Sequence, residues 1–200
     1  MLFAHKIFKI LKWAFLILVG LFIILIIGRV IYLNNQAKTD AQVIKIHNTK
    51  LTLDDVMGKN LPPDPGALTD ATVQGIDANN NGIRDDVELA VFKEYPNSAK
   101  TRAVLLQYAL VLQTEITEPI VNKDTATAVS EEDSRAFDCI GQIVPKSNDD
   151  IQKIELYRKF VEEKQLNTIK RKNIKSDFDN KGGSFELQSG CDVSLNLFSD

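Results

Sequence analysis

The sequence predicts a mainly α-helical protein, in which an N-terminal transmembrane helix precedes a small domain of three to four helices. Three observations lead to this fold class. An almost uninterrupted apolar run covers residues 13–33, apolar residues recur every three or four positions between residues 86 and 174, and apolar and polar residues alternate over residues 185–197. The first two patterns are typical of helices and the third of a strand. A short C-terminal β-hairpin or strand therefore completes the prediction.

The apolar run is long enough to cross a bilayer as one helix. The segment from Trp13 to Leu33 would span about 31 Å at 1.5 Å per residue, which matches a hydrocarbon core of about 30 Å. Trp13 and Tyr32 lie near its two ends, where amphipathic rings favour the membrane interface. Arg29 is one turn from the outer end and can extend its guanidinium to the headgroups. We therefore expect a cytoplasmic tail at 1–12 and a transmembrane anchor at 13–33.

A cleaved signal peptide is the alternative interpretation of the same segment. Lys6, Lys9 and Lys12 would form its basic start. The apolar run is long for a signal peptide, however, and the triplet 39–41 is a weak cleavage site. The sequence therefore favours an anchor over a cleaved signal, and under either interpretation the rest of the chain is exported.

The orientation of the anchor follows from the charges on its two sides. The basic residues before the run favour a cytoplasmic N-terminus, although Arg29, Lys38 and Lys45 on the other side weaken the asymmetry. Two cysteines and a calcium-type loop, described below, suit an exported domain. We expect a single-pass protein of the inner (cytoplasmic) membrane whose C-terminal domain is periplasmic, or extracytoplasmic.

The charge of the remaining chain is mildly acidic. Residues 1–34 contain four of the 24 basic residues and no acidic residue, so the other 20 basic residues stand against all 27 acidic ones, a formal charge of about −7. Nucleic-acid binding normally requires a basic surface. The composition therefore predicts no nucleic-acid partner.

The chain after the anchor divides into a linker at 34–60 and a folded domain at 61–200. Within the linker, residues 43–46 could form a short strand, and Thr52 could cap a short helix at 53–57. The proline-rich stretch 61–66 breaks any helix, and we place the start of the folded domain there.

Four segments of the domain show helical periodicity. The first covers residues 86–94, and the second begins after Asn97 or Ser98 and ends before Pro119. The third covers about 125–144 and the fourth about 149–174. In the fourth, acidic residues come early and the run Lys170–Lys172 comes late, as the helix dipole favours. We interpret that run as a solvated helix end, and a contact with lipid headgroups or a partner is the alternative.

Residues 77–88 carry side-chain oxygens at the spacing that a calcium loop requires. Calcium takes six to eight oxygen ligands, which a twelve-residue loop supplies from positions 1, 3, 5, 7, 9 and 12. Those positions hold Asp77, Asn79, Asn81, the backbone carbonyl of Ile83, Asp85 and Glu88. Gly82 occupies the sixth position, where such a loop turns sharply. The sequence therefore predicts one Ca²⁺ site, with Glu88 as the bidentate ligand.

This segment resembles EF-hand-like calcium loops. Its single-loop form is similar to the loop-plus-one-helix sites of dockerin and thrombospondin type-3 repeats. Arg84 stands at position 8, where an apolar residue normally pairs with a second EF-hand, and the sequence has no second loop. The wider stretch from Pro62 to Glu88 also resembles a recurring motif of an uncharacterised bacterial exported, membrane-anchored family. The resemblance implies calcium and an envelope location, and it supplies no activity.

The alternative interpretation of the loop is a plain turn followed by a helix cap. Asn79–Gly82 could turn because Asn and Gly tolerate the left-handed conformation, and Asp85 with Glu88 could form a capping box. That interpretation leaves Asp77 unexplained. We expect weak binding and a structural calcium, because a sensor normally needs a second hand and an apolar groove to expose.

Cys139 and Cys191 are the only two cysteines in the chain. In an exported domain an even number of cysteines suggests a disulfide, which here would join the third helix to the C-terminal strand. Two buried thiols are the alternative.

The sequence offers little support for catalysis. The only histidines, His5 and His47, lie in the tail and the linker, so no Ser-His-Asp or Cys-His set can be drawn within the domain. Three functions stay open. They are a binding, scaffold or inhibitor-type module that acts on another envelope protein, a hydrolase of envelope polymers that uses paired carboxylates, and a tethered structural domain without a metal.

Overall fold

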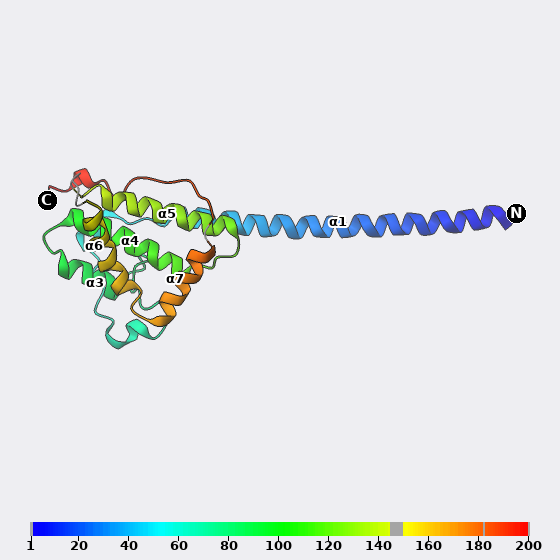
Figure 1. Cartoon of the computed structure of the whole chain (residues 1–200). Helices are drawn as coiled ribbons and strands as arrows, with labels where there is room; N and C mark the ends of the chain where they lie inside the picture. Colours follow the sequence, from blue (N-terminus) through cyan, green and yellow to red (C-terminus); the bar gives the residue numbers. More distant parts are fainter. Residues whose placement is uncertain (1, 145–149, 182, 200) are drawn as a thin grey trace. The chain divides into compact units, whose positions relative to one another are not determined.

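The computed structural model describes residues 2–144, 150–181 and 183–199, which fall into two compact units (Figure 1). The first unit is Met1–Gln42 and the second is Val43–Asp200. Helix α1 (Leu2–Asn48) forms the first unit and continues into the second. Its most apolar 18-residue window has a mean hydropathy of 2.9 and no buried residue. The helix is thus long and apolar enough to cross a membrane, a test that an N-terminal signal sequence also passes.

The second unit is a helical bundle built around α4 (Ala99–Thr117). Around it lie α2 (Leu53–Met57), α3 (Asp85–Glu94), α5 (Lys123–Gly141), α6 (Asp150–Gln165) and α7 (Ile169–Lys181), and two 3₁₀ turns, η1 (Gly66–Asp70) and η2 (Leu195–Leu197), lie in the connecting chain. Helix α4 packs against each of these five helices (Figure 1). Every residue from Thr101 to Ile116 except Thr114 is buried, which explains why this helix is apolar on nearly all sides.

Local signals set the ends of several helices. The Thr52 hydroxyl accepts a hydrogen bond from the Asp55 N–H at the start of α2, and the Ser98 hydroxyl does the same for the Thr101 N–H at the start of α4. Helix α4 ends two residues before Pro119, as predicted. These helices begin and end where the sequence predicts, because a capping side chain satisfies backbone donors that the helix leaves unpaired.

Three expectations about secondary structure were wrong. Residues 43–46 are helical, because Ile46 is buried on Ala128, Val129 and Phe178 as the end of α1. The predicted linker 34–60 therefore contains the end of a helix, α2 and the start of the second compact unit.

The single helix expected over about 149–174 is instead two, and its predicted start at 149 lies outside the described residues. The chain turns at Leu166–Thr168, where the Thr168 hydroxyl accepts a hydrogen bond from the Arg171 N–H and begins α7. The bundle consequently has more helices than the three or four expected.

The C-terminal β-hairpin is absent from the described residues, none of which forms a strand. Residues 183–190 instead run along α5 (Figure 1), held by two bonds between Ser134 and Gln188 and by the Gly190 N–H, which donates to Asp138. Cys139 and Cys191 lie at disulfide-bonding distance, with Cα atoms 5.0 Å apart. The alternating pattern failed because this segment pairs with side chains of a helix and has no neighbouring strand.

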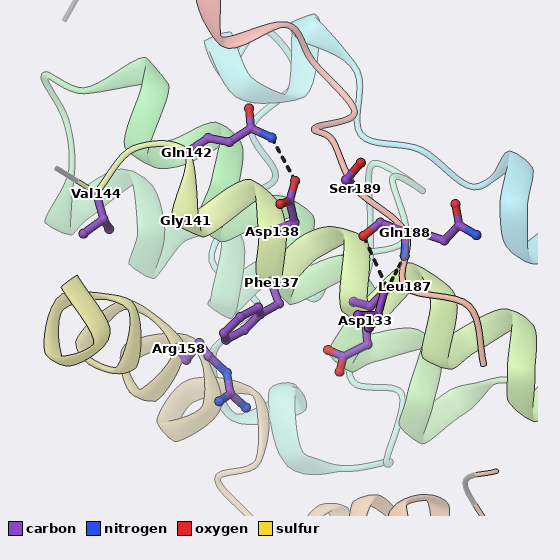
Figure 2. A pocket seen from close by; sticks show the side chains of 11 residues that line it. Asp133, Phe137, Asp138, Gly141, Gln142, Val144, Arg158, Leu187, Gln188 and Ser189 are labelled. Carbon is purple, nitrogen blue, oxygen red and sulfur yellow. Dashed lines mark hydrogen bonds between the residues drawn. The ribbon is translucent and has the colours of Figure 1, made fainter. Parts of the chain in front are cut away.

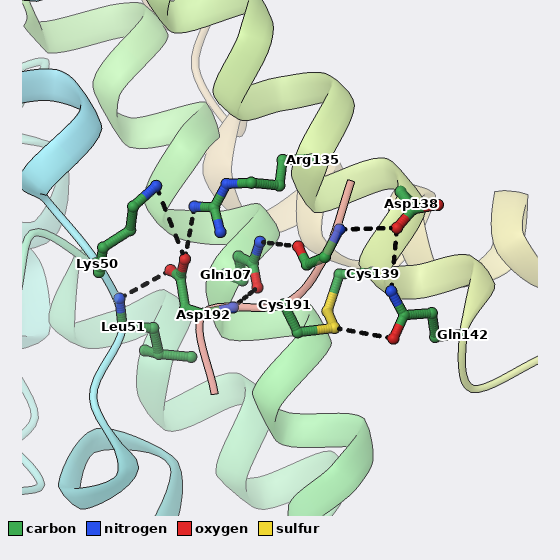
Figure 3. The surroundings of a disulfide bond; sticks show 10 residues. Lys50, Leu51, Gln107, Arg135, Asp138, Cys139, Gln142, Cys191 and Asp192 are labelled. Carbon is green, nitrogen blue, oxygen red and sulfur yellow. Dashed lines mark hydrogen bonds and ion pairs between the residues drawn. A yellow bond between two sulfur atoms is a disulfide. The ribbon is translucent and has the colours of Figure 1, made fainter. Parts of the chain in front are cut away.

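A network of charges surrounds the disulfide (Figure 3). The Asp192 carboxylate accepts a hydrogen bond from the Leu51 N–H at 2.8 Å and pairs with Arg135 at 2.5 Å. Lys50 pairs with Glu132 at 2.6 Å. Burial opposes ionisation of Glu132, but hydrogen bonds from Lys50, His47 and Arg135 hold its pKa below the usual value. The network fixes the chain that follows α1 to α5 and to the C-terminal segment.

A buried carboxyl group in α4 predicts how stability depends on pH. The Glu115 side chain is 1% exposed and lies 3.1 Å from the Lys175 ammonium. Burial raises the pKa of Glu115 from 4.5 to about 8, with a smaller contribution from Asp133, and Lys175 opposes this only in part. Between those pH values the unfolded chain binds fewer protons at this residue than the folded chain, so stability falls as pH rises.

We therefore expect the free energy of unfolding to decrease between about pH 5 and pH 8, and Glu115→Gln to flatten that part of the profile. Urea unfolding, followed by circular dichroism at several pH values, measures the free energy of unfolding and its slope against pH. Glu94→Gln, the same change at an exposed position of α3, should keep the slope. An equal slope in Glu115→Gln and wild type would contradict the prediction.

Candidate calcium site

The predicted loop is organised around the Asp77 carboxylate. Its two oxygens accept hydrogen bonds from the N–H groups of Asn81, at 3.1 Å, and Gly82, at 2.9 Å. The Asn81 side-chain oxygen accepts from the Ile83 N–H at 2.9 Å. Gly82 has φ of +84°, and a Cβ there would lie 2.6 Å from Leu110 Cδ1, so only glycine fits this turn. The loop thus turns sharply at Gly82, as its pattern predicts, and side-chain oxygens of the loop accept hydrogen bonds from its own backbone N–H groups.

Asp85 joins the loop to the helix that follows. It is the first residue of α3, its N–H donates to the Ile76 carbonyl at 2.9 Å, and one carboxylate oxygen accepts from the Ala78 N–H at 2.9 Å. The side chain is fully buried, and its other oxygen, Oδ2, has no hydrogen-bond partner. Burial raises the pKa of Asp85, and the charge of Asp77 raises it further.

Glu88 lies one turn further along α3 and is also buried, with 1% of its surface exposed. One of its oxygens accepts a hydrogen bond from the Asn79 amide at 3.0 Å. Burial raises the pKa of Glu88 to about 7, and the charges of Asp55 and Asp85 add to the effect. The helix therefore carries two buried carboxyl groups toward the loop, and within the described residues neither forms an ion pair with a cationic side chain.

The residue types of the loop, carboxylates and amide oxygens, are those that a hard cation prefers, but the structure does not bring them together as a finished site. In the part of the chain that the structure describes, no three Asp, Glu, His or Cys side chains stand close enough together to hold a metal. The side-chain oxygens of Asp77 and Asn81 already accept hydrogen bonds from backbone N–H groups. In contrast, Asp85 Oδ2 and the side-chain nitrogen of Asn81 are buried and have no hydrogen-bond partner. A buried oxygen without a partner costs free energy, and a bound Ca²⁺ would remove that cost. Ile83 would contribute only its carbonyl, since its side chain is buried in the core.

Sequence reasoning missed two buried arginines, one within the loop and one that bonds to the chain just before it. Arg84 and Arg171 are both fully buried, whereas the sequence shows the first only as a departure from the calcium pattern and the second only as part of a charged helix end. Arg84 donates to the carbonyls of Lys164 and Gln165 at the end of α6, and Arg171 donates to carbonyls of residues 69, 72 and 73. Neither periodicity nor composition signals these contacts, because their partners lie about 80 to 100 residues away.

A second candidate site is a cavity of about 1020 Å³ between α5, α6 and residues 187–189 (Figure 2). The Arg158 guanidinium lies 5.7 Å from the centre of the Phe137 ring in its wall. Two carboxyl groups line the cavity. Asp138 accepts hydrogen bonds from Gln142 and Gly190, whereas burial raises the pKa of Asp133. The cavity therefore has one carboxyl group whose pKa burial raises and one that holds the C-terminal segment in place.

The chain combines one helix that is long and apolar enough to cross a membrane with a helical domain whose two cysteines lie at disulfide-bonding distance. No protein-family model, curated protein or solved structure matches the chain.

Proposed function

We propose that this chain is a membrane-anchored extracytoplasmic (periplasmic) calcium-binding protein, whose loop at 77–88 binds one structural Ca²⁺. The observation that supports it best is the unpartnered Oδ2 of the fully buried Asp85, one turn before the equally buried Glu88. Both residues occupy ligand positions of the twelve-residue pattern. Calcium would supply the charge that these carboxylates lack and thereby stabilise the start of α3.

The proposed location rests on the anchor and the cysteines. Lysines before the apolar segment favour a cytoplasmic N-terminus, and a disulfide persists in an oxidising compartment. Millimolar calcium outside the cytosol also suits a loop of modest affinity, since extracellular modules bind at about 10⁻⁴–10⁻³ M. We propose that the domain acts as a binding, scaffold or inhibitor-type module for another envelope protein.

Calcium should raise the thermal unfolding temperature of the domain by several degrees. At 100 times its dissociation constant a ligand stabilises by about 2.7 kcal/mol, and at ten times by about 1.4 kcal/mol, since each factor of ten in concentration is worth that much. The measurement is thermal unfolding of the full chain in detergent, followed by circular dichroism, with millimolar Ca²⁺ and with chelator.

Glu88→Gln keeps the size of the side chain and removes the bidentate carboxylate, so it should abolish the shift. Glu94→Gln, on the exposed end of the same helix, is the matched control and should keep it. If calcium leaves the wild-type transition unchanged, the loop is a turn with a helix cap and the domain is a tethered structural unit.

A hydrolase of envelope polymers is the second candidate function, and the cavity beside Asp133 favours it. A carboxyl group whose pKa burial raises is suited to act as a general acid. The purified chain should then release soluble fragments from cell-wall polymer, and Asp133→Asn should abolish the release. An inactive wild-type protein would exclude this function and leave the binding module.

A further inference from the structure

Arg84 connects the proposed calcium loop to the turn between α6 and α7. It lies between Ile83 and Asp85, two proposed calcium ligands, and its side chain reaches from the loop to the end of α6. Its guanidinium donates to the Gln165 carbonyl at 3.0 Å and the Lys164 carbonyl at 3.2 Å. These are carbonyls at the end of α6, where helices leave acceptors unpaired and where a cation is favourable. Position 8 therefore contacts a helix end in place of a second calcium loop.

The position of the Arg84 side chain is fixed on both sides. Asp86 accepts two hydrogen bonds from the guanidinium, at 2.8 and 2.6 Å. The aliphatic part of the side chain packs on Gly75, where a Cβ would lie 2.7 Å from Arg84 Cδ. Gly75 immediately precedes Ile76, whose carbonyl accepts the Asp85 N–H. A change in the loop that moves Asp85 would therefore move Arg84 as well.

The chain just before the loop holds the other side of the same turn. Arg171, in the first turn of α7, donates to the carbonyl groups of Thr69, Thr72 and Val73 at 2.7 to 2.9 Å. Asp70 accepts from Arg171 at 2.5 Å and from Asn167 at 3.0 Å. Both ends of the α6–α7 turn are thus bonded to this part of the chain. Arg84 of the loop holds the end of α6, and residues 69–73, which precede the loop, hold the start of α7.

A buried amide chain adds a third connection. The Gln113 amide of α4 donates to the Gln74 carbonyl at 2.8 Å, and the Gln165 amide donates to the Gln113 side-chain oxygen. Gln165 is fully buried at the end of α6. The last residue of α6 is therefore held by Arg84 through its carbonyl, and by Gln113 through its side chain.

We infer that calcium binding in the loop is coupled to the docking of the α6–α7 turn, with Arg84 as the coupling residue. This inference rests on the proposed function. Calcium fixes the carbonyl of Ile83 and the carboxylate of Asp85, and so holds Arg84 against the end of α6. Coupling is reciprocal, so a well-docked turn raises the affinity of the loop for calcium. Calcium in the loop would thus hold the α6–α7 hairpin in its docked position, although that hairpin supplies none of the proposed ligands.

Hydrogen exchange of the full chain in detergent, with millimolar Ca²⁺ and with chelator, tests the coupling, and isothermal titration with Ca²⁺ measures binding separately. We expect amides of residues 162–175 to exchange at least about five-fold more slowly with calcium, the lower end of typical couplings. In Arg84→Lys, which keeps the charge but loses the planar fork, calcium should slow only residues 77–90. Lys153→Arg, the reverse change at an exposed position of α6, should behave as wild type.

The outcomes separate the two proposals. Calcium binding without slower exchange at 162–175 in the wild type would overturn the coupling and leave the calcium site standing, whereas no binding would overturn both. If Arg84→Lys fails to fold, Asn167→Ala tests the reciprocal effect from an exposed position of the turn. It should weaken calcium binding although Asn167 is no proposed ligand, and an unchanged affinity would contradict the coupling.

Discussion

Replacing Cys139 and Cys191 together by alanine should lower the free energy of unfolding by about 4 kcal/mol, because the bond closes a long loop in the unfolded chain. The two residues are 52 positions apart, and cross-linking such a loop removes conformational freedom from the unfolded chain. In the folded domain Asp192, which follows Cys191, accepts a hydrogen bond from the Leu51 N–H and pairs with Arg135. We therefore expect the chain around residues 50 and 190 to loosen first.

Urea unfolding of the full chain, followed by far-ultraviolet circular dichroism, measures this effect. Tryptophan fluorescence would not report on it, since the only tryptophan, Trp13, lies in α1. Cys139 is fully buried, so the alanine variant also loses packing. Wild-type protein with the disulfide reduced keeps both sulfur atoms and isolates the effect of the bond. Equal unfolding midpoints for oxidised and reduced wild type would show that the disulfide does not stabilise the domain.

Arg171→Met should destabilise the domain by about 3 kcal/mol or more, because it leaves buried acceptors and a carboxylate without their donor. Arg171 is fully buried and its guanidinium donates five hydrogen bonds, three of them to backbone carbonyls of residues 69–73. Methionine fills part of the volume but donates no hydrogen bond.

The two neighbouring lysines provide the control. Lys170 and Lys172 are exposed, so changing either to methionine should alter stability by no more than about 0.5 kcal/mol. The same urea unfolding measurement compares all three variants. A similar small effect at all three positions would mean that the 170–172 run is a solvated helix end, as the sequence alone predicts.

The sequence alone predicts the features that depend on neighbouring residues. The apolar helix from Trp13 to Leu33 follows from composition, because hydropathy and length decide whether a helix is able to cross a bilayer. Helix α4 follows from the Ser98 cap and Pro119, and the cysteine pair from the even number of cysteines. The calcium pattern at 77–88 is likewise a matter of spacing, and its ligand set stays a prediction.

Only the tertiary structure decided the features that depend on distant partners. Alternating residues near the C-terminus predicted a strand, but that segment bonds to Ser134 and Asp138 on a helix. Residues 43–46 extend α1 because Ile46 has a buried apolar surface to pack on. Arg84 and Arg171 are charged and would be expected in solvent. They are buried because carbonyl groups far away in the sequence satisfy their planar donors, and no local pattern contains that information.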